Sequence, residues 1–368
     1  MEDLFAFADT LGPAKIVHVH EPRTGLKAVV VIDNVAAGPA IGGVRMAPDV
    51  STEECFRLAR AMTLKNAAAG LRHGGGKAVI FGDPRVPGPE KESLVRAFAG
   101  AIACLTDYIP GPDMGTDETC MAWVHDEIGR AVGLPPEIGG IPLDEIGATG
   151  YGLAQAAEVA APYAGIDLAG ARVAVQGFGA VGRHAARFLA ERGAVLVAAA
   201  DSTGTTLAAD GIDIEALAAI KAAGGGVRDY DGGTVADRDA IVEAACDIWI
   251  PAARPDVLHA GNVDRLNARL VLEGANIPVT EEAEAALHGR GVLVVPDFIA
   301  NAGGVICGAV EYAGGTRAAA FAVIEEKLRA NTAAVLDAAK ADAIAPRAAA
   351  VAMARRRVEA AMGYRRWS

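Results

Sequence analysis

The sequence of 368 residues is poor in aromatic residues and contains no long uncharged apolar run. Since aromatics make up only 5% of the chain, the interior must be built from Ala, Val, Leu and Ile, as in parallel sheets covered by helices. A helix that spans a membrane needs about 20 apolar residues, so we expect no membrane span. The first residues, MEDLFAFADT, lack a basic region followed by an apolar run, and we therefore expect no signal peptide and a cytoplasmic location.

Cysteine and positive charge are also scarce. The five cysteines show no Cys-x-x-Cys spacing, which indicates reduced, buried thiols and predicts no metal site. The formal net charge of -12 argues against a nucleic-acid partner. The basic cluster Arg355-Arg356-Arg357 lies in a helical stretch and is interpreted as a solvated face.

Glycine is abundant, and the 44 glycines gather in short runs typical of tight turns near ligands. From Arg172 onward strands alternate with helices, which predicts a doubly wound parallel sheet. Its expected strands are 173–176, 194–200, 246–250, 270–272 and 292–295. The earlier part predicts strands at 27–32 and 78–81 and helices at 51–69, 93–105 and 117–131, and the Ala-rich tail 318–362 predicts helices with a break at 344–346.

The length is sufficient for two domains. We expect an α/β fold with a first domain at 1–147, a Rossmann-like nucleotide-binding domain at 148–315, and C-terminal helices, 316–368, that pack back on the first domain.

A glycine-rich loop marks the expected cofactor site: Gly177, Phe178, Gly179, Ala180, Val181 and Gly182. It follows an apolar strand and opens an amphipathic helix, the context in which G-x-G-x-x-G indicates dinucleotide binding rather than an ordinary glycine turn. Gly177 permits the turn, Gly179 lets the backbone approach the pyrophosphate, and Gly182 lets the helix lie close to the strand. Asp201 ends the next strand and can hold the ribose hydroxyls, which favours NAD and leaves NADP possible.

Lys65 is the first of three candidate functional side chains. The helical period places it on one stripe with Met62, Leu58 and Cys55, on the apolar inward side of the helix. A buried lysine is costly unless it is paired, so a ligand carboxylate is one interpretation. A lysine that reaches solvent from the end of the helix is the alternative.

Lys77 and Asp113 are the other two candidates. Lys77 stands between three glycines and an apolar strand, where desolvation would lower its pKa and make it a usable base. A surface lysine at the start of a strand is the alternative. Asp113 lies in a rigid Pro- and Gly-rich turn, where it either exchanges a proton with Lys77 or only caps the next helix.

Several motifs in the chain together resemble the glutamate/leucine/phenylalanine/valine dehydrogenase family. They run in the order of that family over nearly the whole chain: 60–70 with 74–77, Gly-Pro-Asp-Met-Gly-Thr at 111–116, Ala-Thr-Gly at 148–150, Glu-Gly-Ala-Asn at 273–276 and Ala-Asn-Ala-Gly-Gly-Val at 300–305. The length resembles the leucine and phenylalanine branch. The resemblance implies a substrate-binding and oligomerisation role for the first domain, and a homo-oligomer.

The resemblance also implies a reaction and the residues that perform it. An L-amino acid is oxidatively deaminated to a 2-oxo acid and ammonia, reversibly, with hydride transfer to NAD or NADP. Lys65 would bind the substrate α-carboxylate, Lys77 would activate water, and Asp113 would shuttle protons. Residues expected around the nicotinamide and its ribose are Thr149, Ala275, Asn276 and Asn301.

The substrate side chain is predicted to be apolar. Glutamate-specific members of the family have a lysine directly before the paired glycines, and this chain has Ile41 there, before Gly42 and Gly43. They also have a serine three residues after the valine of Asn-Ala-Gly-Gly-Val, and this chain has Gly308 there, counted from Val305. A charged side chain would therefore lose water without gaining a partner. The residues expected to contact substrate, besides Lys65, are Ile41, Gly42, Gly43, Met62, Gly111, Val305 and Gly308. The small size of Gly111 and Gly308 suggests room for a larger, even aromatic, side chain.

Three alternatives stay open at this point. A glutamate dehydrogenase with other anchors would use Arg72 or His73 in place of the lysine. A catalytically silent dinucleotide-binding protein would keep the loop at 177–182 without turnover. A hydroxyacid dehydrogenase usually needs a His–carboxylate pair with an arginine, and no such set stands at comparable positions.

Overall fold

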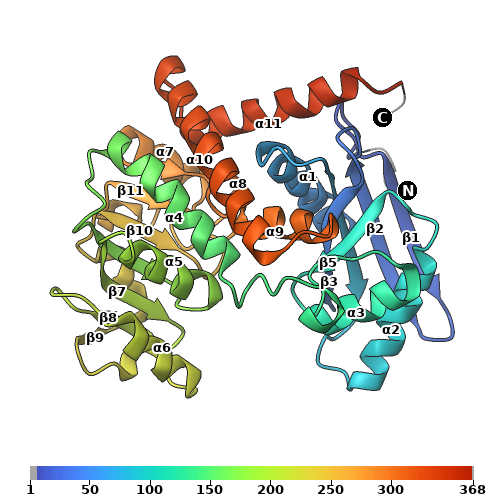
Figure 1. Ribbon diagram of the computed structural model, residues 1–368, viewed down its shortest axis with the longest axis horizontal. Coiled ribbons are helices and arrows are strands. Elements are labelled where there is room, and N and C mark those ends of the chain that lie inside the picture. Colours follow the sequence, from blue (N-terminus) through green and yellow to red (C-terminus); the bar gives the residue numbers. More distant parts are fainter. Residues whose placement is uncertain (1–5, 367–368) are drawn as a thin grey trace. The chain divides into compact units, whose positions relative to one another are not determined.

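The computed structural model describes residues 6–366 (Figure 1). Two terminal segments lie outside the described part. They are residues 1–5, the start of the stretch in which no signal peptide is expected, and residues 367–368, the end of the expected C-terminal helices. The described chain forms two compact units. The first contains the residues up to Pro142, Val305–Ala320 and the residues from Val351 onward, and the second contains Leu143–Gly304 and Phe321–Ala350.

The first unit is built on a sheet of five strands. In the order in which they lie side by side, the strands are β1 (Lys15–Glu21), β2 (Leu26–Asn34), β4 (Gly74–Phe81), β3 (Ala40–Ala47) and β5 (Tyr108–Pro112). β1, β2 and β4 pair antiparallel, and β3 runs parallel to both β4 and β5. The helices of this part are α1 (Thr52–Ala68), α2 (Gly88–Ala101) and α3 (Glu118–Ile128).

The two faces of this sheet are covered differently. Side chains of α2 and α3, such as Phe98 and Met121, form the main core with one face of the sheet. On the opposite face, Cys55 and Ala59 of α1 pack in a smaller cluster with Val79. Lys77, two residues before Val79 on β4, projects from this second face.

Close packing requires all three glycines at the start of β4, and one of them, Gly75, faces α1. A Cβ on Gly75 would be 2.0 Å from the backbone nitrogen of Thr63 on α1, and one on Gly74 would be 1.7 Å from the carbonyl oxygen of Asn34. A Cβ on Gly76 would be 3.0 Å from the ring of Tyr108. These glycines are thus required by internal packing, whereas the sequence alone suggested approach by a substrate.

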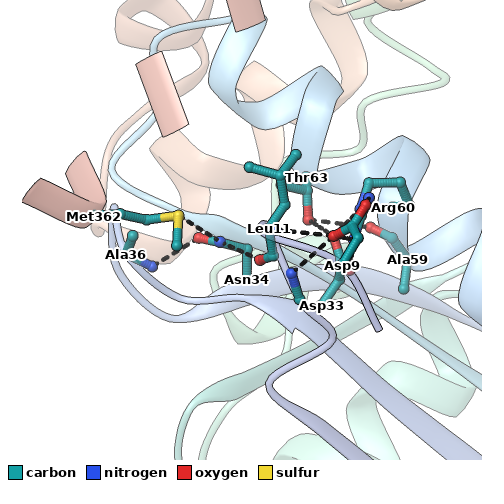
Figure 2. Close-up of polar contacts among 10 residues, drawn as sticks. Asp9, Leu11, Asp33, Asn34, Ala36, Ala59, Arg60, Thr63 and Met362 are labelled. Carbon is teal, nitrogen blue, oxygen red and sulfur yellow. Dashed lines mark hydrogen bonds and ion pairs between the residues drawn. The ribbon is translucent and has the colours of Figure 1, made fainter. Parts of the chain in front are cut away.

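A buried carboxylate holds α1 in this position (Figure 2). Asp33 on β2 is fully buried and accepts hydrogen bonds from Arg60 Nε at 2.8 Å and Thr63 Oγ1 at 2.6 Å, both on α1. Arg60 also forms an ion pair with Asp9, so one guanidinium links the segment before β1 to the sheet and the helix. Because the buried charge is paired and hydrogen-bonded, the network fixes the helix that carries Lys65.

The second unit has the predicted doubly wound sheet, and this prediction is confirmed. Its strands, in spatial order, are β12 (Leu293–Val295), β11 (Leu270–Leu272), β10 (Ile248–Pro251), β6 (Arg172–Gln176), β7 (Val195–Asp201), β8 (Gly204–Leu207) and β9 (Thr234–Ala236). The five expected strands pair parallel. The short strands β8 and β9, which the sequence analysis does not predict, extend the sheet antiparallel at the β7 edge. The helices are α4 (Ala148–Ala160), α5 (Ala180–Ala190), α6 (Ile214–Ala222), α7 (Glu281–Gly289) and α8 (Asp297–Ala300).

The C-terminal part consists of α9 (Gly303–Tyr312), α10 (Arg317–Asp342) and α11 (Pro346–Gly363), with the break at the expected position. The division of this part differs from the expectation that 316–368 packs wholly on the first domain. Residues Phe321–Ala350 belong to the second unit, because α10 bonds to α4 and the turn after it. Tyr151 donates to Glu325 at 2.8 Å, and Tyr163 donates to Asp337 at 2.7 Å.

No helix within residues 6–366 combines the length and the apolar character that crossing a bilayer requires.

Candidate active site

The open part of the α1 face of the first sheet carries a lysine–aspartate pair. Lys77 projects from β4, and its Nζ donates to Oδ2 of Asp113, which follows directly after β5. Asp113 is held in its turn by Thr116, whose hydroxyl accepts from the Asp113 backbone N–H at 3.0 Å and donates to the Val44 carbonyl at 2.7 Å. The structure therefore brings together the two residues expected to do the proton chemistry.

Burial and charge perturb both members of this pair. The Lys77 side chain is only 7% exposed, and burial lowers the pKa of its ammonium against the opposing effect of Asp113. Burial acts to raise the pKa of Asp113, but the neighbouring charges of Lys77 and Arg45 outweigh it and hold the pKa below its ordinary value. A lysine with a lowered pKa next to a carboxylate is suited to general acid–base work.

Arg45 is a member of this site that the sequence analysis missed. Its Nε donates to Asp113 Oδ2 at 3.2 Å, and its second arm forms an ion pair with Glu54 of α1 at 2.6 Å. The signal was present in the sequence: Arg45 lies two residues after Gly43 on the same strand, so its side chain emerges on the same face of the sheet.

Gly43 makes room for the pair. A Cβ at this position would lie 2.7 Å from the Asp113 Cβ and 3.2 Å from Lys77 Nζ. Gly42 is constrained by the sheet itself, since a Cβ there would lie 1.6 Å from the carbonyl oxygen of Gly76. Only Gly43 therefore faces the functional groups.

Lys65 and Met62 lie half-buried in the last turns of α1. The buried stripe of the helix runs through Cys55, Ala59, Thr63 and Asn66, so Lys65 and Met62 flank this stripe, whereas the periodicity placed them on it. The helix end is fixed by Asn66, whose side-chain amide donates to the Gly74 carbonyl at 2.7 Å. α1 therefore presents Lys65 from a rigid element, which is what positioning of a substrate group requires.

An apolar cluster lies on the same face of the sheet. Ile41 of β3, Ile109 of β5 and Val132 are buried and in contact, with Ala309 of α9 packed against them. Gly111 and Gly308 both face Val132: a Cβ on Gly111 would be 3.0 Å from a Val132 methyl, and a Cβ on Gly308 would be 3.7 Å from it. Val305 lies half-buried in the same helix, α9.

This arrangement corrects the expected space at Gly111 only, because a Cβ on Gly308 would make an ordinary contact. Val132 already fills the space beside Gly111, and it borders the space beside Gly308. The sequence analysis missed Val132 because it lies in a loop far along the chain from Ile41, and no motif marks it.

In the second unit, the glycine loop has the geometry expected for pyrophosphate binding. Gly177 has φ +96, a conformation that favours glycine. A Cβ on Gly182 would be 1.9 Å from the Gly177 carbonyl oxygen, so α5 lies directly against the loop, whereas a Cβ on Gly179 would meet nothing within 4 Å. The open space at Gly179, at the positive end of α5, fits a dinucleotide phosphate. Phe178 is buried, and Ala180 and Val181 lie half-buried in the first turn of the helix.

Asp201 ends β7, as predicted, but its carboxylate is already engaged. Oδ1 accepts from the backbone and hydroxyl of Thr203 at 2.8 and 2.6 Å, and Oδ2 accepts from Lys221 at 2.5 Å and from the Val227 N–H at 3.1 Å. Lys221 therefore places a positive charge at this carboxylate, although residues 202–204 contain no lysine or arginine. The preference for NAD inferred from Asp201 is weakened, because a free ribose-binding acid would favour NAD more strongly.

A cluster around Asn301 brings together three of the four residues expected at the nicotinamide. The Asn301 side-chain amide donates to the Ala275 carbonyl and to Asn276 Oδ1, both at 3.1 Å, so it fixes the turn after β11. Thr149 lies at the start of α4, and a Cβ on Gly304 would be 3.1 Å from its hydroxyl.

Beneath that turn lies a buried charge network that the sequence analysis also missed. Arg347 of α11 forms ion pairs with Glu273, Asp297 and Glu284. Burial raises the pKa of Glu273 to about 8, against the effect of Arg347. Because Glu273 directly precedes Gly274 and Ala275, the network helps to fix the turn after β11, to which Asn301 is hydrogen-bonded.

Comparison with known proteins gives matches over nearly the whole chain. A family model described as "Glutamate/Leucine/Phenylalanine/Valine dehydrogenase" matches residues 139–366. A second, described as "Glu/Leu/Phe/Val dehydrogenase, dimerisation domain", matches residues 13–130. Glutamate dehydrogenase from Aeropyrum pernix is 41% identical over 322 residues, which cover 82% of this chain and 77% of that protein.

Solved structures show the same fold. The hetero-hexameric glutamate dehydrogenase from Thermus thermophilus, in its Leu-bound form, superposes with a TM-score of 0.83 at 30% identity, covering 95% of this chain and 89% of the other. L-tryptophan dehydrogenase from Nostoc punctiforme superposes with a TM-score of 0.75 at 26% identity, covering 96% and 97%. Proteins similar to this chain thus carry names with different substrates.

Proposed function

Because the chain belongs to the glutamate/leucine/phenylalanine/valine dehydrogenase family, we propose that it oxidatively deaminates an L-amino acid with an apolar side chain. Membership makes it an amino acid dehydrogenase that uses NAD or NADP. The substrate side chain, the role of each residue and the direction of the reaction are the parts that we propose.

The observation that carries the choice of an apolar substrate is the cluster next to the Lys77–Asp113 pair. Ile41, Ile109 and Val132 offer no charge or hydrogen bond to a side-chain carboxylate. A glutamate carboxylate there would lose its hydration without a partner. Burial of a Val, Leu or Phe side chain instead contributes about 1.5–3 kcal/mol.

The alternative anchors for glutamate fit less well. His73 Nδ1 donates to the Pro39 carbonyl at 3.1 Å, and burial lowers the pKa of the ring, so the ring is neutral at pH 7. Arg72 is exposed at the turn between α1 and β4. Arg45 also forms an ion pair with Asp113, and its charge is already balanced by Asp113 and Glu54.

We assign the chemical steps to residues of the first unit. Lys65 binds the α-carboxylate, and a nicotinamide cofactor, when bound, would supply the acceptor for the hydride of the substrate Cα. Neutral Lys77 takes a proton from the water that attacks the imine carbon, and Asp113 passes a proton to the departing amine. The products are a 2-oxo acid, ammonia and the reduced cofactor, and the open space at Gly179 with the Asn301 turn would hold the dinucleotide.

We further propose a homo-oligomer in the cytoplasm. The family description of residues 13–130 as a dimerisation domain supports the oligomer. The cysteines within the described residues are free thiols, and four of the five are buried, which suits a reducing compartment. Light scattering of the purified protein would give the assembly directly.

The decisive experiment is a substrate panel with NAD and NADP in parallel. We expect kcat/KM for leucine, valine or phenylalanine to exceed that for glutamate by about tenfold or more. Ile41→Lys should raise glutamate turnover from a low baseline, and Ile41→Met is the matched control that keeps the pocket apolar. Comparable kcat/KM for glutamate in the unsubstituted protein would refute the apolar proposal, and no turnover of any amino acid, with cofactor binding retained, would indicate a silent protein.

A further inference from the structure

A single buried carboxylate holds the loop that carries Val132. Glu311 lies on α9 and is 8% exposed. Its Oε1 accepts from the backbone N–H of Leu134 at 3.1 Å, and its Oε2 accepts from the backbone N–H of Ile141 at 2.8 Å. The loop is therefore fixed at both ends of the segment 134–141 by a residue more than 160 positions away in the chain.

The same loop is tightly packed at Val132. The Val132 N–H donates to the Pro110 carbonyl at 2.8 Å. Gly133 has φ +71, and a Cβ there would lie 2.5 Å from Pro112, so the loop rests directly on β5. Little freedom remains for Val132 as long as the loop keeps this position.

α9 supplies both the clamp and the opposite wall. Gly308 faces Val132, and Glu311 lies three residues further, on the same side of the helix. The two hydrogen bonds that Glu311 accepts therefore tie the loop that follows Val132 to the helix that carries Gly308.

We propose that Glu311 is a positioning residue that fixes Val132 and thereby sets which amino acid side chains the enzyme accepts. The inference rests on the proposed function, because it assigns the apolar cluster to the substrate side chain. A carboxylate that accepts two buried N–H groups forms strong, charge-assisted bonds, and their loss leaves donors unpaired, so the loop must move to find water.

The test uses Glu311→Gln, which has the same shape but offers one acceptor and turns an NH2 group toward the second N–H. We expect the ratio of kcat/KM for phenylalanine to kcat/KM for valine to change by about tenfold or more. KM for the reduced cofactor should stay within about twofold. Hydrogen exchange should speed up at the amides of Leu134 and Ile141, which reports on the clamp without any turnover.

A double-mutant cycle separates this role from a purely structural one. If Glu311 acts through Val132, then Glu311→Gln should shift the ratio by less than about twofold in a Val132→Ala background. Val29→Ala, which removes methyl groups from the small cluster between β2 and α1, is the stability control, since Val29 lies in the same unit but in a different core cluster from Leu134. If Glu311→Gln does not fold, Glu311→Asp, one methylene shorter, is judged by the same criteria.

The outcomes are distinct. The inference is overturned if the Glu311→Gln variant is active and keeps the parent's ratio of kcat/KM for phenylalanine to kcat/KM for valine. It is also overturned if the variant shifts this ratio equally in the parent and in the Val132→Ala background. Either result leaves the proposed function standing. Absence of amino acid turnover in the unsubstituted protein would overturn the proposed function and this inference together.

Discussion

Arg45 should control the pH at which the Lys77–Asp113 pair becomes active. Replacement of Arg45 by Met removes a positive charge whose Nε lies 3.2 Å from Asp113 Oδ2. Arg45 lowers the pKa of Asp113, and as a like charge it also lowers the pKa of Lys77. Both pKa values should therefore rise in the variant.

The sign of the effect on rate follows from the proposed role of Lys77. A general base must be neutral, so kcat/KM rises with pH through the lysine pKa, and a higher pKa moves this rise to higher pH. Two unit charges at this distance attract by about 5 kcal/mol at an effective dielectric constant of about 20. The loss of this attraction acts on Asp113, whereas the rate follows Lys77. If the pKa of Lys77 rises by about one to two, its neutral fraction, and with it kcat/KM at neutral pH, falls roughly tenfold to a hundredfold.

The assay is the initial rate of oxidative deamination, followed by absorbance of the reduced cofactor, across neutral and alkaline pH. Arg45→Lys keeps the charge and should recover much of the activity. Glu54→Gln alters the other partner of Arg45 without touching Asp113, and its profile should match that of the parent. A profile for Arg45→Met that stays in place or moves to lower pH would refute the electrostatic reasoning.

Three other outcomes are expected. Lys77→Met and Asp113→Asn should each lower kcat by about 10²–10⁴ with reduced-cofactor binding retained, whereas turnover near that of the parent would exclude them as the acid–base pair. Gly179→Ala should weaken reduced-cofactor binding about tenfold or more in a fluorescence titration, with little change in Tm. Gly182→Ala should lower Tm, because a Cβ at Gly182 meets backbone atoms and one at Gly179 does not, and the reverse pattern would contradict the assigned loop geometry. The pKa of Glu273 is about 8 in the folded state against an ordinary 4.5, so the folded state holds this proton more tightly, and the free energy of unfolding should fall as pH rises between these values. In urea titrations Glu273→Gln should flatten this dependence on pH, and an unchanged slope would contradict the raised pKa.

The sequence predicts those parts of the molecule whose cause is local. The G-x-G-x-x-G loop needs a turn at Gly177 and close packing at Gly182, and both requirements lie within six residues of chain. The parallel strands of the second unit are short apolar runs between helical segments, so their positions can be predicted within a few residues. The strands β8 and β9 were not predicted because they pair with each other and with β7, and their sequence is not markedly apolar.

Contacts between distant segments could not be predicted in the same way. The cation at Asp201 comes from Lys221, one helix later in the chain, so local inspection of residues 202–204 found none. The partner of Glu273 is also distant in the sequence, since Arg347 comes from α11. Such pairs form because a buried carboxylate needs a partner, but the physical need does not reveal which of many arginines or lysines supplies it.

The glycines of the candidate site show why substrate size cannot be derived from a motif. A glycine states only that one side chain is absent, and the neighbour that enters the space decides whether a substrate can use it. At Gly75 the neighbour is α1, at Gly43 it is the Lys77–Asp113 pair, and at Gly111 it is Val132. If Val132 borders the substrate, selectivity depends on how firmly its loop is held, and therefore on Glu311 and its two hydrogen bonds more than on the number of small residues in the pocket.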